Sequence, residues 1–315
     1  MITQLATEAS DFADVVGGAL EDAGGIDLVA EFERGLPVAV RIEELLGRLG
    51  VWDLQPGNGG SELEAAAAAC KAAGRCALPY PIAERLAARD GVDTDAVGVV
   101  AGGALRLNHV RPDLRWRVFD LCGNQAVVTS AGEPFGGKLS RTVSPIVVGP
   151  WESGGSPALV VVLQSWVLLG MVSRAVELTS QYIQDRHQFG KAIAAFQAVQ
   201  FRLADMAVSE QSFDAAARYA LWSLSQERSD VLTEALALRV SALEAADNVF
   251  RSAHQLHGAI GFCDETKVSW LSRHSQALRR LPLGRSQTSA LYLERCEQRP
   301  LEGLFSDPIP DALLG

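Results

Sequence analysis

The chain has few cysteines and an excess of acidic over basic residues. Its five cysteines are an odd number among 315 residues and include no C-x-x-C pair, which argues against a disulfide framework and against a zinc site. The 38 acidic and 28 basic residues give a formal net charge of -10, which opposes binding to phosphate backbones and anionic lipid. We therefore expect no metal site and no nucleic acid partner.

Long apolar runs are also missing. No uninterrupted run reaches the ~20 residues that a membrane-spanning helix needs. The richest stretch, from Ala158 to Met171, is interrupted by Gln164 and Ser165 and is read as a buried helix. The N-terminus carries early acids and lacks the basic residues that open a secretory signal. We expect a cytoplasmic protein without a membrane anchor.

Residues 1–95 are broken by glycine, proline and aspartate at intervals that favour short helices. Pro37 can open one helix and Gly50 can close it. Ser61 followed by Glu64 has the capping-box pattern ahead of an alanine-rich run. With 48% hydrophobic and 21% charged residues, the composition is that of a globular protein. We assign residues 1–95 to an N-terminal helical domain.

Residues 96–150 change to short β-branched runs, which are VGVV, ALRLNHV, WRVFDL, QAVVTS and TVSPIVVG. Glycine pairs and a Gly-Asn pair separate them. A segment of this length allows only a small, reduced β domain. The residues from Pro150 to Pro157 are read as the linker that leaves it.

Residues 151–315 carry apolar residues that recur every three, four or seven positions, over residues 159–183, 196–224 and 231–256. Helices of roughly 25 to 30 residues with such wide apolar stripes cover one another most simply in an antiparallel bundle. The predicted fold is therefore α+β, mainly α, in the order helical, β, helical.

Two segments next to these stripes combine polar residues with glycines. In the first, DRHQFGK, Arg186 lies where a cation complements a helix C-terminus, and Gly190 breaks the helix. In the second, HQLHGAIGF, small residues allow a backbone or a ligand to approach Gln255. Each segment also has a purely structural interpretation. In the first, Arg186 is a cap or salt-bridge residue and Phe189 fills a helix corner. In the second, a glycine cap is followed by a turn.

Together, the two segments resemble the acyl-CoA dehydrogenase family. The family signature R-x-x-F-G, with F-Q and L-A-x-M downstream, is matched by Arg186, Phe189, Gly190, Phe196, Gln197, Leu203, Ala204 and Met206. The later Q-x-x-G-G-x-G-F is matched from Gln255 to Phe262, with Ala259 in place of one glycine, and an arginine that commonly follows is matched by Arg273. The resemblance is strong over residues 158–275, moderate over the N-terminal helices and poor over residues 96–150.

The resemblance implies an α,β-dehydrogenation of an acyl-CoA with FAD as the oxidant. It also implies N-terminal helices, a middle β domain and a C-terminal bundle that mediates subunit contacts. The implied FAD contacts hold the ADP half of a cofactor bound mainly to a neighbouring subunit, and they are Arg186, Gln188, Phe189, Gln197, Gln255, Gly258 and Gly261. A guanidinium suits a diphosphate, and small residues let backbone amides approach it.

The catalytic glutamate of the family has no counterpart at its two usual positions. Alignment from Gln255 places one position on the segment Leu281 to Gly284, and counting back from Arg186 places the other near Val160. The bundle acids Glu177, Glu244 and Asp247 are better explained as solvated or paired residues, since Asp247 and Arg251 are spaced i,i+4. We predict no catalytic residue on this chain.

Residues 125–140 also lack the T-E-x-x-x-G-S-D type stretch with which the family cradles the flavin ring. The chain thus looks like the short, degenerate subunit of actinobacterial α2β2 acyl-CoA dehydrogenases that act on steroid side chains. The implied partner is a longer homologue that carries the glutamate and shares the FAD. The alternatives are a non-catalytic scaffold subunit that holds no flavin and a flavin-dependent oxygenase of the same fold.

Overall fold

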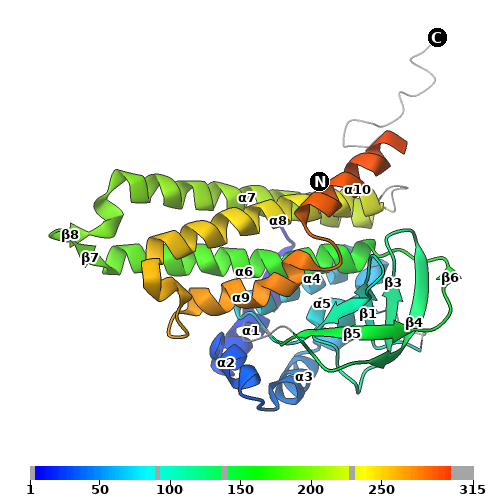
Figure 1. Cartoon of the computed structure of the whole chain (residues 1–315). Helices are drawn as coiled ribbons and strands as arrows, with labels where there is room; N and C mark the ends of the chain where they lie inside the picture. Colours follow the sequence, from blue (N-terminus) through cyan, green and yellow to red (C-terminus); the bar gives the residue numbers. More distant parts are fainter. Residues whose placement is uncertain (1–3, 89–92, 136–140, 227–230, 299–315) are drawn as a thin grey trace, which may run out of the picture.

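The computed structural model describes residues 4–88, 93–135, 141–226 and 231–298 and has the predicted order of helices, strands and helices (Figure 1). The described N-terminal residues form α1 (Thr7–Asp22), α2 (Asp27–Glu33), α3 (Val38–Arg48), α4 (Gly60–Arg75) and α5 (Ile82–Leu86), with the 3-10 turns η1 (Val51–Asp53) and η2 (Pro56–Asn58) between α3 and α4.

The helix boundaries follow some of the predicted signals. α3 begins directly after Pro37, and Gly50 adopts a φ of 75° just beyond its end, as expected for a closing glycine. The predicted capping box is wrong, because α4 begins at Gly60 and no side chain caps it. The Glu64 carboxylate instead accepts a hydrogen bond from the backbone N–H of Ala6 at 2.6 Å, so it ties α4 to the start of α1.

The β region contains a strand in each of the five predicted runs: β1 (Ala96–Val99), β2 (Arg106–Asn108), β3 (Trp116–Phe119), β4 (Asn124–Ala131) and β5 (Val143–Val148). The described strands are ordered β1-β3-β4-β5-β2, with β1 parallel to β3 and the other pairs antiparallel. β6 (Glu152–Ser153) pairs with β4, so the segment predicted as a linker contributes a strand. A small separate core around Leu107, Trp116 and Val118 supports this sheet.

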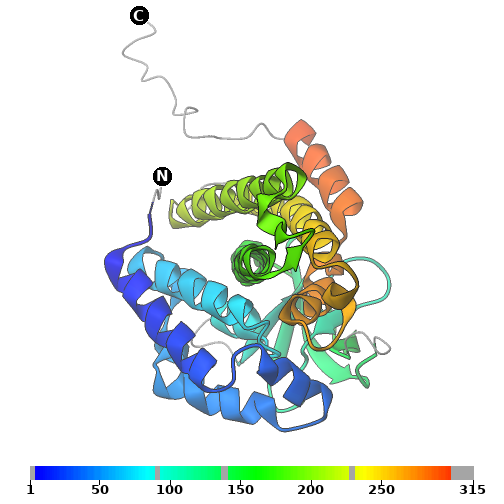
Figure 2. The same ribbon diagram turned by 90° about the vertical axis from the view of Figure 1, so that its left-hand side faces the viewer.

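The long helices α6 (Ala158–Asp185), α7 (Gln197–Ser225) and α8 (Val231–His257) have 28, 29 and 27 residues, as the periodicity predicts. Figure 2 looks almost along α6, which lies at the centre with α4, α7, α8 and α9 (Lys267–Arg280) around it. α6 is long and apolar enough to cross a membrane, but 78% of its most apolar window is buried inside the protein. It is therefore the central core helix that the interrupted run predicts.

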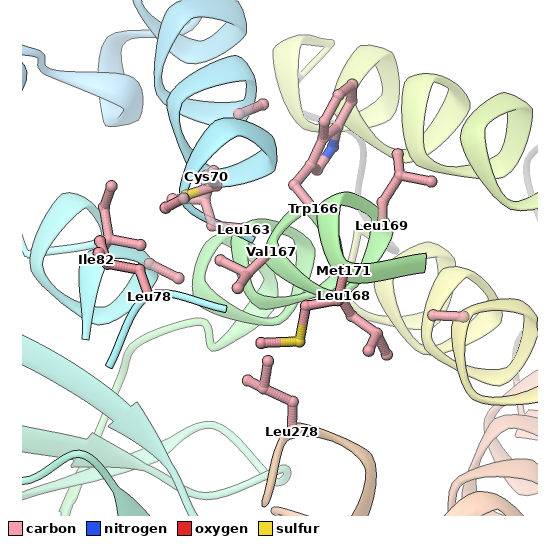
Figure 3. Packing of buried hydrophobic residues seen from close by; sticks show 14 of the residues in the cluster. Cys70, Leu78, Ile82, Leu163, Trp166, Val167, Leu168, Leu169, Met171 and Leu278 are labelled. Carbon is pink, nitrogen blue, oxygen red and sulfur yellow. The ribbon is translucent and has the colours of Figure 1, made fainter. Parts of the chain in front are cut away.

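α4 and α6 cross in direct backbone contact. A Cβ atom on Gly74 would overlap the Val167 carbonyl oxygen, and one on Gly170 would overlap the carbonyl oxygen of Lys71. Around the crossing lie large apolar side chains of α6, including Trp166 and Leu163, together with Cys70 of α4 (Figure 3). Because each helix places a glycine against the other helix's backbone, the position of α6 is fixed against the N-terminal helices.

A buried arginine holds the connection between α9 and α10 (Arg285–Gln298), two helices that the sequence analysis did not predict. Arg239 of α8 is 4% exposed, and its Nη2 donates to the carbonyl oxygens of Leu278, Leu281 and Leu283. Burial lowers the pKa of Arg239 to about 10. Its charge is thus solvated by backbone carbonyls, which fixes the path of the chain after α9.

Candidate functional site

The C-terminal end of α6 runs into a tight hairpin. β7 (His187–Gln188) and β8 (Lys191–Ala192) pair around Phe189 and Gly190, whose φ angles of 54° and 79° both lie in the left-handed region. Two consecutive residues of this kind make a type I′ hairpin turn. The turn η3 (Ile193–Ala195) then leads into α7. We call residues 186–197 the first corner; it projects from one end of the bundle (Figure 1).

Neither Phe189 nor Arg186 of the first corner has the structural role that the sequence analysis offered for it. Phe189 is 91% exposed, so the interpretation in which it fills a helix corner is wrong. The left-handed backbone costs a bulky residue roughly 1 kcal/mol or more. The Phe189 ring makes an edge contact with Phe196, at 6.2 Å between ring centroids. Among the described residues the Arg186 guanidinium has no acidic or hydrogen-bonding partner, so no salt bridge accounts for it either.

The second corner follows α8. The helix ends at His257, and Gly258 has a φ of 67°, so the predicted glycine cap is present. The turn η4 (Gly258–Phe262) comes next, and Gly261 within it is buried. A Cβ atom on Gly258 would meet nothing within 4 Å, which leaves its backbone open to an approaching group. We call residues 254–262 the second corner.

An aromatic pair links the last turns of α6, just before the first corner, to the second corner. The rings of Tyr182 on α6 and His257 on α8 stack at 4.3 Å between centroids, and the Tyr182 hydroxyl donates to the His257 carbonyl oxygen at 3.4 Å. Burial lowers the pKa of His257, and its Nδ1–H donates to the Ala253 carbonyl oxygen at 2.8 Å, so the stacked ring is neutral at pH 7. Segments 75 residues apart in the sequence therefore lie at the same end of the bundle.

All seven predicted FAD contacts lie in these corners. They are Arg186, Gln188, Phe189 and Gln197 in the first and Gln255, Gly258 and Gly261 in the second, and all except Gly261 are exposed. Within the described residues, no hydrogen bond occupies the side chains of Arg186, Gln188, Gln197 or Gln255. A free guanidinium, free amides and an open glycine backbone are donors that suit a diphosphate. These donor groups fit the ADP half of FAD. The seven contacts with FAD remain a prediction.

Neither segment to which the sequence analysis assigned the family's glutamate carries an acid. Val160 is a buried core residue of α6, and Leu281 to Gly284 follows α9. However, a carboxylate from a third element lies close to both segments. Glu84 of α5 is 6% exposed and accepts a hydrogen bond at 2.7 Å from Nε2 of Gln164, one helical turn after Val160. It also lines a cavity of about 10 Å³ together with Leu281 and Pro282.

The surroundings of Glu84 leave acceptors without donors. Burial raises the pKa of Glu84, and no cation of the described chain pairs with it. Gln164 Oε1 and Asn108 Oδ1 are buried, have no hydrogen-bond partner in the described structure, and belong to residues that line the same cavity. Sequence reasoning missed Glu84, because in IAERLAAR it has the spacing of an ordinary solvated helix residue.

The bundle acids have the structural roles that the sequence suggests, with one change of partner. Glu177 forms a two-point ion pair with Arg75 at 2.7 and 2.8 Å, and Glu244 is exposed. Asp247 pairs with Arg279 of α9, so the predicted Asp247–Arg251 pair is wrong. Asp247 therefore pairs with an arginine of another helix instead of with Arg251 on its own helix. Arg251 has no acidic partner among the described residues.

A cleft of about 620 Å³ lies between the β region and the face formed by α8 and α9. We call it the arginine cleft, since the residues that line it include Arg106, Arg251, Arg273, Arg279 and Arg280. Its other walls contain His254, Phe262, Phe135, Phe250, Ala277 and Leu281. Of these arginines, the sequence analysis named Arg273 and, as a partner of Asp247, Arg251. Arg273, Arg279 and Arg280 lie on α9, Arg251 lies on α8 and Arg106 on β2, and no spacing along the chain indicates that these three elements meet.

Among the described residues, neither metal ligands nor cysteine thiols form a further candidate site. The described residues contain no group of three or more His, Cys, Asp or Glu side chains that could hold a metal ion. All five cysteines are free thiols, and burial raises the pKa of Cys70 and raises that of Cys76 to about 12. Such thiols are poor nucleophiles.

Comparison with known proteins identifies the bundle. Residues 162–291 match the family described as "Acyl-CoA dehydrogenase, C-terminal domain". A curated relative, 3-sulfinopropanoyl-CoA desulfinase from Paraburkholderia xenovorans, is 37% identical over 98 residues, which cover 30% of this chain. The match spans only 24% of that protein's own length.

Solved structures extend the likeness to the whole fold. The chain is similar to one in the crystal structure of the ChsE4-ChsE5 complex from Mycobacterium tuberculosis, with a TM-score of 0.74, 17% identity, and coverage of 96% of this chain and 100% of that one. It is also similar to a chain of the Tcur3481-Tcur3483 steroid ACAD, with a TM-score of 0.74, 17% identity and coverage of 92% and 98%. At these identities the likeness concerns the fold.

Proposed function

Because the chain belongs to the acyl-CoA dehydrogenase family, we propose that it is a subunit of a heteromeric FAD-dependent acyl-CoA dehydrogenase whose longer partner carries the catalytic glutamate. The observation that carries this proposal is the group of exposed side chains without partners at one end of the bundle, Arg186, Gln188, Gln197 and Gln255. Water solvates exposed polar side chains, so the support comes from the gathering of this donor set beside the open backbone of Gly258 at one end of the bundle.

The proposed role of the corners is to complete a cofactor site at a subunit interface. The Arg186 guanidinium would hold the diphosphate by charge-assisted hydrogen bonds, and the backbone at Gly258 would approach it closely. When bound, FAD would supply the oxidant that takes the β-hydride of the acyl thioester, and a carboxylate would take the α-proton. The exposed Phe189 ring offers an apolar face to an adenine or to the partner.

The structural neighbours favour an assembly of two kinds of subunit. One of these neighbours belongs to the ChsE4-ChsE5 complex, and the other, Tcur3481-Tcur3483, is described as a steroid ACAD. By analogy we propose an α2β2 heterotetramer, a steroid side-chain CoA thioester as the substrate class, and the cytoplasm as the compartment.

The proposal is tested by co-purifying the chain with a longer homologue from the same genome. The double variant Arg186→Ala/Gln255→Ala should form the complex but lose most of its FAD, measured from flavin absorbance per complex. The matched control Arg48→Ala/Gln287→Ala changes exposed residues away from the corners and should keep it. Full FAD content in the corner variant would favour the scaffold alternative. A homomer that binds FAD and dehydrogenates acyl-CoA alone would refute the subunit assignment.

Glu84 favours a second candidate function, in which the chain supplies its own proton acceptor. Its carboxyl lies between the two segments at which the family places the glutamate, and a buried carboxyl of raised pKa is suited to general base catalysis near neutral pH. Under this candidate, Glu84→Gln abolishes turnover by the complex and leaves its FAD content unchanged. Under the first proposal, the same variant keeps its turnover.

A further inference from the structure

Polar groups line a second interior cavity beside the Glu84 carboxyl. Glu84 borders both the cavity of about 10 Å³ described above and another of about 20 Å³. We call the larger one the histidine cavity, because His109 and His274 line it together with Asn108 and Glu84. Glu84 belongs to α5, Asn108 ends β2 and is followed by His109, and His274 lies on α9. Polar residues from three separate parts of the fold thus surround one small space.

His274 connects the histidine cavity with the protein surface. It is 2% exposed, and its Nε2 lies 3.1 Å from Oε1 of Glu33, the last residue of α2. The Glu33 side chain is 21% exposed and therefore reaches solvent. The contact with His274 lowers the pKa of Glu33 although burial opposes this, and the charge of Arg273 lowers it further. Glu33 is therefore ionised at neutral pH and can accept a proton from the imidazole.

The other ring nitrogen of His274, Nδ1, is buried and has no hydrogen-bond partner among the described residues. The same holds for Oδ1 of Asn108. Buried polar atoms are nearly always paired, either with protein or with water. A water molecule needs about 10–15 Å³ of such space and two to four polar partners. The histidine cavity offers both.

His109 can hydrogen-bond to such a water molecule without trapping a proton. Burial and the charge of His274 lower the pKa of His109 to about 3, so its ring is neutral at pH 7. The His109 backbone N–H donates to the Thr142 carbonyl oxygen at 2.7 Å, and its ring lies edge-on to Phe32 at 5.9 Å between centroids. The ring is therefore held in place from two sides.

We propose that these groups form a proton path between solvent and Glu84, in which a water molecule in the histidine cavity links the Glu84 carboxyl to His274. When Glu84 ionises, its proton passes to the water, and the water releases a proton to Nδ1 of His274. The imidazole then gives its Nε2 proton to the Glu33 carboxylate, which releases it to solvent. The reverse transfers reload Glu84. The path rests on the packing around Glu84 and not on either proposed function.

Exchange of the Glu84 proton for deuterium tests the path on the full-length chain. The infrared band of a protonated carboxyl shifts on deuteration, and Glu84→Gln identifies the band by removing it. In mildly acidic deuterated buffer, below the folded pKa of Glu84, we expect this proton to exchange much faster than the backbone amides of α6, which exchange only when the fold opens. Exchange as slow as that of the α6 amides would overturn the path.

Two variants locate the path. His274→Phe removes both ring nitrogens, and Glu33→Gln removes the acceptor carboxylate at a partly exposed position where the fold tolerates the change. Each should slow exchange at Glu84 roughly tenfold or more, because a group that relays the proton is lost, and should leave the α6 amides unchanged. The control Asp27→Asn removes an exposed carboxylate from the start of the same helix and should exchange like the natural chain. Unchanged exchange in either folded variant would refute the path and direct attention to the smaller cavity, which Arg106 also lines.

Discussion

Replacing Gly170 by alanine should strongly destabilise the chain, because the new methyl group has no space. Its Cβ would overlap the Lys71 carbonyl oxygen and lie 2.9 Å from both the Lys71 carbonyl carbon and the Arg75 nitrogen. Carbon atoms in contact normally lie about 3.5–4.0 Å apart. The clashing atoms belong to the α4 backbone, so no side-chain rotation relieves them, and the helices must move apart by roughly 1 Å.

Two effects of opposite sign set the magnitude. Overpacking costs about 1–3 kcal/mol, and a backbone clash falls at the upper end of that range. Alanine regains about 1 kcal/mol of helix propensity over glycine. We expect a net loss of roughly 2 kcal/mol in the free energy of unfolding. Gly74→Ala faces the same crossing, where its Cβ would lie 2.8 Å from the Val167 carbonyl carbon, and should cost a similar amount.

Urea unfolding of the single and double variants measures these values. Once one methyl group has parted the helices, the second meets less resistance, so the double variant should lose less than the sum of the singles. Gly18→Ala is the matched control, since a Cβ on this α1 glycine meets nothing within 4 Å, and it should stabilise by roughly 0.5–1 kcal/mol. If Gly170→Ala were as stable as the natural chain, the close crossing of α4 and α6 would be refuted.

Three further predictions concern buried charge and strain. Glu84 holds its proton more tightly in the folded chain than in the unfolded one, so its contribution to stability is present below its unfolded pKa and is lost as pH rises through its folded pKa; Glu84→Gln should therefore gain stability relative to the natural chain as pH rises above the unfolded pKa of the glutamate, and parallel curves in urea unfolding at several pH values would contradict this. Asparagine suits a type I′ turn better than phenylalanine, so Phe189→Asn should stabilise the isolated chain by up to about 1 kcal/mol in urea unfolding. The same variant should weaken assembly with the partner, measured by analytical ultracentrifugation, because the exposed ring is lost. Unchanged assembly would show that the ring does not contact the partner. Arg239→Met leaves three carbonyl oxygens without their donor and should cost roughly 3 kcal/mol or more; chemical unfolding measures it, and a loss below 1 kcal/mol would show that water replaces the guanidinium.

The sequence predicted the elements whose signal is local. The apolar periodicity located α6, α7 and α8, and the β-branched runs located β1 to β5, because both signals repeat within one segment. The predictions failed where contacts with a distant segment determine the local structure. Glu64 was assigned to a capping box, yet its carboxylate bonds to Ala6, and the Pro150 to Pro157 segment pairs with β4 although nothing in it resembles a strand.

The candidate sites divide in the same way. The two motifs identified the corner residues, but their location at the same end of the bundle comes from the packing of α6 against α8, which no spacing encodes. Glu84 and the arginines of the cleft had ordinary surroundings in the sequence. The burial of Glu84 and the gathering of the arginines around one cleft come from the packing of α5, α8, α9 and the β region, which is a property of the whole fold.

The stacked pair Tyr182–His257 also bears on how a bound molecule would be held. The Tyr182 carbonyl oxygen accepts a hydrogen bond from the Arg186 backbone N–H at 2.9 Å, and the Tyr182 ring stacks on His257. A ligand that orders the hairpin should therefore also order the glycine turn, so that a second contact there costs less conformational entropy. The contributions of Arg186 and Gln255 to binding affinity should therefore be non-additive. Replacing either residue should remove most of the affinity that the other contributes.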